Sequence, residues 1–511
     1  MPRRPPVQPD TRTETLARPA RSPWLALAVL MLPVLLVSVD NTVLAFALPA
    51  ISEALAPTGQ QLLWIVDIYP LVLAGLLVPM GSLSDRLGRR RLLLVGGTGF
   101  TLVSALAAFS PDAPTLIAAR ALMGVFGAML MPSTLSLIRN LFEDPTQRRT
   151  AIAIWAAGFS AGAALGPVVG GLLLENFAWG SVFLMAVPVM LPLLLLGPVL
   201  IPESRDPAPG PVDPLSVLLV LLAMAPFVFA IKTAAVRGLD LTVILCAAVA
   251  VVAGVAFVRR QLSRPEPMLD VSLFTRPVFS GAVSANLLSV FSLVGFLYFV
   301  SQHLQLVSGH SPMNAALLLV PGLVVTILAG LLAVRLVRRL APATVATLAL
   351  LLNAVAFVMV ALTGSWGSDL MLVIAFALLG AGVGAAETIS NDLILSAVPA
   401  HRAGAASAIS ETAYETGAVL GTAVLGSLLN LAYRSRVELP AELSDVERAA
   451  ASETLGGATA VAERLPERVA GPMLDSAHRA FDSGVVVTGA IGAVLMVIAA
   501  LVAHRTLRGA R

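Results

Sequence analysis

Long apolar runs alternate with short clusters of proline, glycine and charged residues along the chain after residue 23. Most runs are about 20 residues long, the length that an α-helix needs to cross a hydrocarbon core of about 30 Å. The pattern therefore predicts fourteen membrane-spanning helices. Their expected limits are residues 24–49, 62–83, 92–110, 114–139, 151–174, 181–201, 214–232, 240–259, 279–306, 313–336, 343–363, 370–397, 404–431 and 485–503.

The composition excludes a water-soluble protein. Hydrophobic residues make up 57% of the 511 residues and charged residues 12%, against about 25% charged residues in soluble domains. Because too few polar positions remain to cover an exterior, we expect an all-α polytopic membrane protein. The single cysteine, Cys246, lies within an apolar run, which excludes a disulfide scaffold and a cysteine metal site, and we expect no metal.

Basic residues are distributed unevenly between the predicted loops. If the N-terminus is cytoplasmic, the inner segments hold 24 of them and the short outer loops hold two, Lys232 and Arg237. This asymmetry places both termini in the cytoplasm. Since the basic residues are explained by their position in the inner loops of a membrane protein, we expect no nucleic-acid partner. Arginine is used almost to the exclusion of lysine, which indicates a GC-rich bacterial genome and so a bacterial inner membrane.

One outer segment, residues 432–484, breaks this pattern with six arginines and nine acidic residues. Long loops cross the membrane regardless of charge, so the predicted topology survives. The stretches Leu443 to Leu455 and Thr459 to Val469 are rich in alanine, glutamate and arginine. They predict either a helical hairpin that caps the outer face or a disordered loop.

A repeat divides the chain into two halves. Residues Gly81, Arg86, Arg89 and Arg90 recur at identical spacing as Gly330, Arg335, Arg338 and Arg339. Likewise Pro145, Arg148, Gly162 and Gly166 are matched by Pro399, Arg402, Gly417 and Gly421. Two like halves around a midplane cavity are typical of a transporter that works by alternating access. We expect a disordered cytoplasmic tail (1–23), a six-helix bundle (24–201), linker helices 7 and 8 (202–278), a second six-helix bundle that includes the outer segment (279–503) and a cytoplasmic tail (504–511).

The loop after the second span carries the run Gly81-Ser-Leu-Ser-Asp85-Arg86-Leu-Gly88-Arg89-Arg90-Arg91. A plain positive-inside cluster would explain the arginines but neither Asp85 nor the glycines. The run resembles the loop 2–3 signature of the major facilitator superfamily. From Trp24 to Val502 the chain resembles the fourteen-helix drug:proton antiporters of that superfamily. The resemblance implies that Gly81, Asp85, Arg86, Gly88 and Arg89 form a conformational latch.

A second motif lies in the span 151–174, where small residues recur at intervals of four. It comprises Gly158, Gly162, Gly166, Pro167, Gly170 and Gly171. Spacing of four aligns small residues along one stripe and lets another helix approach closely, and the proline kinks the span. The stripe resembles the antiporter signature of the superfamily. The alternative is close helix packing with no functional meaning.

Two further stretches narrow the resemblance. They are Asp40-Asn-Thr42-Val-Leu-Ala-Phe-Ala-Leu-Pro49 and Trp64-Ile-Val-Asp67-Ile-Tyr69. Both resemble the QacA, SmvA and LfrA group of multidrug exporters, and the LfrA type most of all. Many relatives outside that group have asparagine where this chain has Ala45, so the similarity is to the quaternary-ammonium branch.

Ionisable residues inside spans need a partner or a water-filled path, because each costs several kcal/mol in the bilayer. The acidic ones are Asp40, Asp67, Glu387 and Asp392, with Glu411 and Glu415 in the thirteenth span, and the only base expected there is Arg120. An excess of carboxylates attracts cations and protons. Asp40 and Arg120 lie in the same outer half of the membrane by residue count. We assign proton coupling to Asp40, Arg120 and Asp67, with a permanent Asp40–Arg120 salt bridge and a solvated entrance role for Asp67 as alternatives.

Cargo binding is expected to combine carboxylates with adaptable apolar side chains. The candidates are Asp40, Glu387, Asp392, Asn391, Met123, Phe296 and Tyr298. Asp392 is near the inner end of its span, where contact with water alone would also explain it. Glu411 is expected to tie the thirteenth span to its neighbours, and His303 to contact water at the outer rim.

These features predict a proton-coupled antiporter that exports lipophilic cations by alternating access. The expected cargo is quaternary ammonium compounds and dyes such as ethidium, with fluoroquinolones as a further candidate class; the alternative is export of an endogenous lipid or secondary metabolite. An enzyme is disfavoured, because no nucleophile with a base and no metal cluster is present in the sequence. No glycine-rich phosphate loop with lysine occurs, so we expect no cofactor, the proton gradient rather than ATP as the energy source, and a functional monomer.

Overall fold

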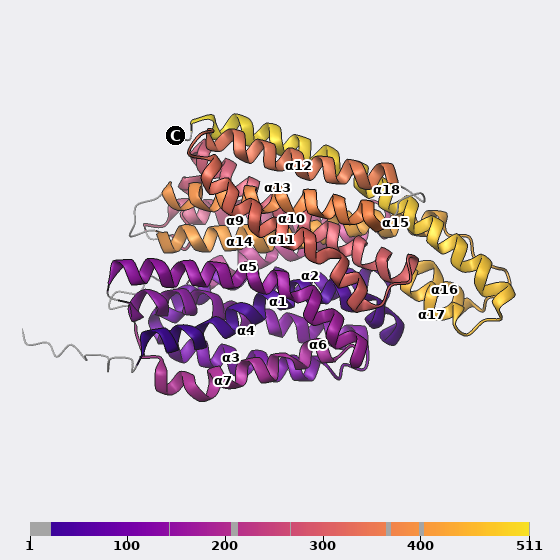
Figure 1. The fold of residues 1–511 in the computed structure, drawn as a ribbon, viewed down its shortest axis with the longest axis horizontal. Helices are drawn as coiled ribbons and strands as arrows, with labels where there is room; N and C mark the ends of the chain where they lie inside the picture. Colours follow the sequence, from indigo (N-terminus) through magenta and orange to yellow (C-terminus); the bar gives the residue numbers. More distant parts are fainter. Residues whose placement is uncertain are drawn as a thin grey trace, which may run out of the picture.

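The computed structural model describes residues 22–142, 144–205, 213–265, 267–363, 369–397 and 403–509, and these residues form helices joined by short connections (Figure 1). Within this described part, twelve helices are long and apolar enough to cross a membrane. Two more helices, α3 and α5, occupy the predicted spans 92–110 and 151–174 and run beside the others. An all-α polytopic fold is therefore confirmed, while the count of fourteen crossings stays a prediction.

Helices of the N-terminal half lie together at the bottom of Figure 1. They are α1 (Pro23–Leu55), α2 (Gly59–Leu87), α3 (Arg89–Ala107), α4 (Ala113–Leu141), α5 (Pro145–Asn176), the short α6 (Ser181–Leu184) and α7 (Ala186–Leu200). Side-chain caps fix several starts: Ser22, Thr58 and Asp112 each accept a hydrogen bond from a backbone N–H in the first turn. The inserted pair follows as α8 (Pro214–Arg237) and α9 (Leu241–Ser263).

The C-terminal half repeats this plan. It contains η1 (Val271–Thr275), α10 (Pro277–Gln302), the π-helix η2 (His303–Val307), α11 (Pro312–Leu336), α12 (Pro342–Thr363), α13 (Asp369–Ser396), α14 (Ala403–Gly421), the π-helix η5 (Thr422–Gly426), α15 (Ser427–Arg436), α16 (Asp445–Glu453), α17 (Leu455–Ala462), α18 (Glu467–Thr506) and η6 (Leu507–Gly509). Equivalent helices pair in both halves: α2 packs on α4 as α11 packs on α13, and α1 packs on α5 as α10 packs on α14.

Glycines allow the closest of these pairs to form. On α5, Gly166 lies against Thr42 of α1, and on α14, Gly421 lies against the backbone of Phe291 of α10. A side chain at either glycine would occupy space that the facing helix already fills. The matched glycines of the sequence repeat are therefore equivalent contacts in the two halves. Pro399 and Arg402, the other matched pair, lie outside the described residues.

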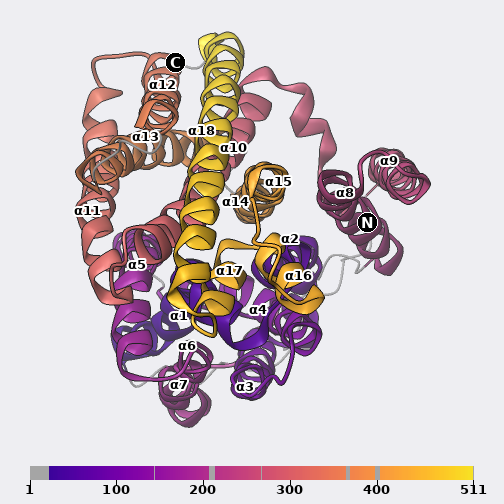
Figure 2. The same ribbon diagram turned by 90° about the vertical axis from the view of Figure 1, so that its right-hand side faces the viewer.

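The inserted helices lie at the flank of the bundle, where the two halves meet (Figure 2). α8 packs along α2 and also contacts η5 and α15, while α9 packs on α8. At the start of α8, Asp213 accepts two hydrogen bonds from Arg260 of α9, at 2.8 and 2.9 Å. These bonds hold the pKa of Asp213 below its usual range. These bonds join α8 and α9 into one unit, which lies over the seam, the line along which the two halves meet.

At one end of the bundle, α16 and α17 form a helical projection that we call the outer cap (Figure 1). We call this end outer, following the predicted topology, and the end near Gly88 inner. Of the two alternatives for residues 432–484, the structure has the helical one, and α18 runs unbroken for 40 residues from the cap into the last span. The cap docks on the N-terminal half, because the backbone N–H of Gly59 donates to the Glu453 carboxylate at 3.1 Å.

The outer rim corrects one expectation. His303 does not point to water: its Nδ1 lies 3.1 Å from Asp482 of α18, and its ring stacks on Phe481. The extension of α18 beyond the span covers the rim, which the hydropathy pattern did not predict because that extension is amphipathic.

The two halves touch at their outer ends. Ser301 donates to the backbone oxygen of Ala45 at 2.8 Å, and Gln305 donates to that of Phe46 at 3.3 Å. Gly171 of α5 lies against Met313 at the start of α11. The described structure is therefore closed on its outer side.

Gly166→Ala is expected to destabilise the protein although alanine favours helices. The added methyl group would meet Thr42 and the backbone of α1, and overpacking costs about 1–3 kcal/mol. Gly471→Ala in α18, which adds a methyl group into open space, is the matched control and should raise stability slightly. Thermal unfolding of the purified protein in detergent measures both; equal shifts in the same direction would contradict the close α1–α5 contact.

Candidate functional site

A small central cavity lies between the two halves. Its lining comes from α1, α2, α4, α10, α14 and η5, and its polar lining residues are Asn41, Thr42, Asp67, Arg120, Tyr298, Tyr414 and Thr422. The cavity volume is about 40 Å³, room for about three water molecules. Drug-sized ligands occupy pockets of about 300 Å³ or more. The halves must separate before such a ligand can enter.

A buried ion pair lies beside this cavity. Nη1 of Arg120 on α4 donates to Oδ2 of Asp40 on α1 at 3.0 Å, and both side chains are almost fully shielded from solvent. The guanidinium also lies over the rings of Tyr69, at 4.9 Å, and Phe183, at 5.9 Å. Sequence depth alone predicted that Asp40 and Arg120 lie at one level, and the structure brings them into contact. The charge-assisted hydrogen bond joins α1 to α4.

A second buried pair corrects the expected position of Lys232. Nζ of Lys232 lies 2.8 Å from Oδ2 of Asp67, with both side chains fully buried, and 4.1 Å from the centre of the Trp64 ring. Lys232 was expected in an outer loop, and Arg120 was expected to be the only base inside a span. Instead α8 continues to Arg237, because Asp67 neutralises the lysine and removes the need for it to reach water.

Glutamates of the C-terminal half face the same region. Asn41 of α1 donates to Oε1 of Glu415 on α14 at 3.3 Å, a hydrogen bond that crosses between the halves. Glu411 lies within electrostatic range of both Glu415 and Glu387, and Tyr414 lies among the three. The central region therefore contains more carboxylates than bases, as the sequence predicted.

Other cargo candidates lie apart from the cavity. Asp392 is exposed near the inner end of α13. Asn391 accepts a short hydrogen bond from Ser410 of α14, so it joins two helices of the same half. In this conformation Asp392 is exposed and Glu387 is partly buried, so the alternative that Asp392 contacts water fits its position, and its role in cargo binding stays a prediction.

Of the apolar candidates, Tyr298 lines the cavity. Phe296 instead packs within the C-terminal half, with its ring centre 4.9 Å from Phe299 and 5.6 Å from Phe376. Met123 is fully buried and does not line the cavity. The sequence shows that an aromatic residue lies on a helix, but not whether its side chain faces the cavity or the core of its own half.

The antiporter motif lies directly behind Asp40. Gly158, Gly162, Gly166 and Gly170 face Met31, Ser38, Thr42 and Val43 of α1. Thr42 donates to the backbone oxygen of Ala163 at 3.1 Å, and Pro167 is buried in the same helix. The stripe thus fixes the helix that carries the central carboxylate.

The latch motif builds the turn between α2 and α3. Asp85 accepts hydrogen bonds from Nε and Nη2 of Arg89, at 2.9 and 2.7 Å, within its own loop. Gly88 has φ of +113°, a conformation that favours glycine. Gly81 faces Pro132 of α4, and Arg86 lies in the last turn of α2.

Glu203 is a functional candidate that the sequence did not reveal. Its carboxylate accepts the backbone N–H groups of Arg90 and Arg91, at 3.0 and 3.1 Å, and so caps the start of α3. It begins the proline-rich linker, more than one hundred residues after the loop that it caps, and no local pattern connects the two.

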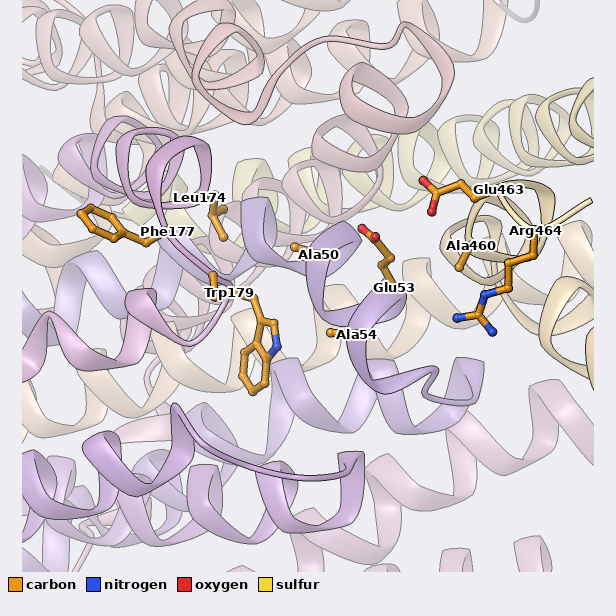
Figure 3. Close-up of a pocket in the computed structure, with 10 residues that line it drawn as sticks. Ala50, Glu53, Ala54, Leu174, Phe177, Trp179, Ala460, Glu463 and Arg464 are labelled. Carbon is orange, nitrogen blue, oxygen red and sulfur yellow. The ribbon is translucent and has the colours of Figure 1, made fainter.

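An outer groove of about 320 Å³ lies between the N-terminal half and the outer cap. Figure 3 shows Leu174, Phe177 and Trp179 on one side of Glu53, and Glu463 and Arg464 of the cap region on the other. The groove combines aromatic and charged side chains at the closed end of the molecule.

Comparison with known proteins identifies the family. The family model of the Major Facilitator Superfamily matches residues 30–422. The chain belongs to the Major Facilitator Superfamily. It is 56% identical over 492 residues to the multidrug efflux pump LfrA of Mycolicibacterium smegmatis, with 96% of each chain covered. It is 40% identical to the methyl viologen resistance protein SmvA of Salmonella typhimurium, with 93% of this chain and 97% of the relative covered.

Solved structures agree with this fold. A bacterial homologue of the human lysosomal transporter Spinster, in an inward-facing and unoccupied conformation, superimposes with a TM-score of 0.65 at 18% identity, with 95% of this chain and 97% of that chain covered. The major facilitator resemblance inferred from the loop at residues 81–91 is thereby confirmed. This member of the superfamily is a multi-pass membrane transporter and not an enzyme.

Arg120→Met is expected to destabilise this transporter strongly, because it leaves Asp40 as a buried carboxylate without its partner. Removing one partner of a buried pair costs about 3–5 kcal/mol, whereas removing both charges is far less costly. Asp40→Asn combined with Arg120→Met should therefore unfold at a temperature closer to that of the wild type. Thermal unfolding in detergent compares the variants; a double variant no more stable than the single one would contradict the pairing.

Proposed function

We propose that this chain is a proton-coupled antiporter that exports lipophilic cationic drugs by alternating access. The observation that carries the proposal is the excess of buried carboxylates between the halves, with Asp40, Asp67 and Glu415 close to the central cavity. Such a site attracts cations and protons and repels anions. The named relatives support the cargo class, since one is a multidrug efflux pump and another confers resistance to methyl viologen, a dication.

The exchange follows from competition for the same carboxylates. In the inward-open state a cationic drug enters between the halves, and its charge displaces a proton from Asp40 toward the cytoplasm. The halves then rock, and the outer contacts of Ser301 with Ala45 and of Gln305 with Phe46 separate. The drug leaves on the outer side and a proton binds in its place. Arg120 stays charged throughout and stabilises Asp40 whenever neither drug nor proton occupies it.

Other named groups support this cycle. Glu387, Glu411 and Glu415 hold the cation on the C-terminal side together with Tyr298. Asp67 lies on the opposite wall, while Asp392 attracts cations at the inner mouth. The loop from Gly81 to Arg89 acts as the latch of the outward-facing state. In the described state, which is closed on its outer side, Asp85 is bonded to Arg89 of its own loop, so the latch is released. The glycine stripe of α5 keeps α1 in register during rocking.

The energy source and setting complete the proposal. The proton gradient drives transport without a cofactor, and the sequence has no phosphate-binding loop with lysine that would serve ATP. The transporter works as a monomer in a bacterial inner membrane, with both termini in the cytoplasm.

Asp40→Asn tests the proton role, because asparagine keeps the size of the side chain but cannot exchange a proton. We expect ethidium efflux from energised cells to fall to the level of wild-type cells treated with a protonophore. Glu442→Gln, in the exposed outer segment, is the matched control and should leave efflux unchanged. Undiminished, protonophore-sensitive efflux by the Asp40 variant would overturn the assignment, and wild-type efflux that survives the protonophore would overturn antiport itself.

A further inference from the structure

The only lysine in the sequence, Lys232, is buried in the inserted helix α8. Its ammonium lies between the carboxylate of Asp67, at 2.8 Å, and the face of the Trp64 indole, at 4.1 Å from the ring centre. The two contacting groups are one helical turn apart on α2, so they present a carboxylate and an aromatic face side by side. Together they surround a single positive charge.

These are the two contacts that recognise a lipophilic cation. A carboxylate neutralises the charge, and an aromatic face binds quaternary ammonium and similar cations through its quadrupole. Asp67 also lines the central cavity. Thr422 of η5 lies beside the Asp67 carboxylate and lines the same cavity. The same carboxylate therefore faces Lys232 and the space that cargo would enter.

We propose that Lys232 is a resident cation in the cargo site, which a lipophilic cation displaces from Asp67 and Trp64 when it binds. The inference rests on the proposed function and names how one part of the site is regulated. In the empty transporter Lys232 prevents Asp67 from remaining a bare buried anion. It also lowers the apparent affinity for cargo, because a cargo cation must displace an ammonium that is covalently held at the site.

The displaced ammonium has somewhere to go. Lys232 is five residues from the outer end of α8 at Arg237, a distance of about 8 Å along the helix axis. A lysine stem of four carbons can extend toward the interface while its root stays in place. The last carbonyl groups of the helix attract a positive charge. The neighbouring hydrogen bond from Gln60 to Thr233, at 3.1 Å, keeps α8 attached to α2 meanwhile.

The position of α8 makes this exchange relevant to rocking. An apolar cluster joins Val228 of α8 to Leu71 of α2 and to Val419 and Ala423 of the C-terminal half. α8 touches both halves at the seam. An ionic contact between α8 and α2 therefore resists the movement of one half relative to the other. Displacing Lys232 removes that contact when cargo is present, which couples occupancy to movement.

Labelling of the wild-type protein tests the displacement directly. As the only lysine, Lys232 gives an unambiguous signal with a water-soluble acetylating reagent, read as modification of its peptide by mass spectrometry, while the N-terminal amine serves as an internal reference. The full chain in lipid nanodiscs is treated with and without saturating tetraphenylphosphonium, a lipophilic cation that has no amine. We expect labelling of Lys232 to become several-fold faster with the cation. Unchanged or slower labelling, with binding of the cation verified by calorimetry, would overturn the proposal.

Affinity provides an independent readout. Lys232→Met removes the resident cation, so tetraphenylphosphonium should bind about tenfold more tightly, because apparent affinity scales with the fraction of sites that are free. Lys232→Arg keeps a cation at this position, so the tenfold gain should be absent. Asp67→Asn combined with Lys232→Met should lose the gain. A folded Lys232→Met variant with equal or weaker binding would contradict the proposal, and if that variant does not fold, the labelling result decides.

The outcomes also separate this inference from the proposed function. A wild-type protein that binds tetraphenylphosphonium and exports ethidium, with Lys232 unaffected by cargo, would leave the antiporter assignment intact and reduce Lys232 to a structural bridge. A wild-type protein that neither binds the cation nor exports ethidium would overturn the cargo class and this inference with it.

Discussion

A charge inside an apolar interior needs a partner or a water-filled path, and the two ion pairs that meet this requirement organise the molecule. A lone ionised group costs several kcal/mol in the membrane, so each of the two central aspartates contacts a base on another helix. Asp40 fastens α1 to α4 through Arg120, and Asp67 fastens α2 to α8 through Lys232. The two pairs differ in kind. A guanidinium is a rigid fork that stays charged, whereas an ammonium on a flexible stem can leave its partner.

Close helix packing holds these pairs where the halves meet. The glycine stripe of α5 lets α1 lie against it, and Gly417 and Gly421 of α14 do the same for α10. Both central helices are thus held from behind, with their polar residues turned toward the partner half. The bond between Asn41 and Glu415 then crosses the interface. The glycine contacts occupy one face of α1 and of α10, and the opposite face of each helix presents its polar residues to the partner half.

Much of this arrangement follows from the sequence. Helix limits came from apolar runs, the two halves from repeated glycine and arginine spacing, and the contact of Asp40 with Arg120 from equal depth. Lys232 was misplaced because a charge at the end of an apolar run looks like a loop residue until its partner, far away in the chain, is known. Phe296, a predicted cargo residue, packs in the core of the C-terminal half in this conformation. Periodicity identifies apolar residues but does not distinguish a core face from a cavity face.

The long last helix has a mechanical consequence. α18 continues without a break from the inner end of the C-terminal half to the outer cap, a length of about 60 Å for its 40 residues. At its outer end α18 meets the cap, where Glu453 of α16 contacts Gly59 and Gly456 of α17 packs on Ser52 of the N-terminal half. Because displacement grows with distance along a rigid rod, a tilt of α18 about its inner end would move the cap further than any other part of that helix.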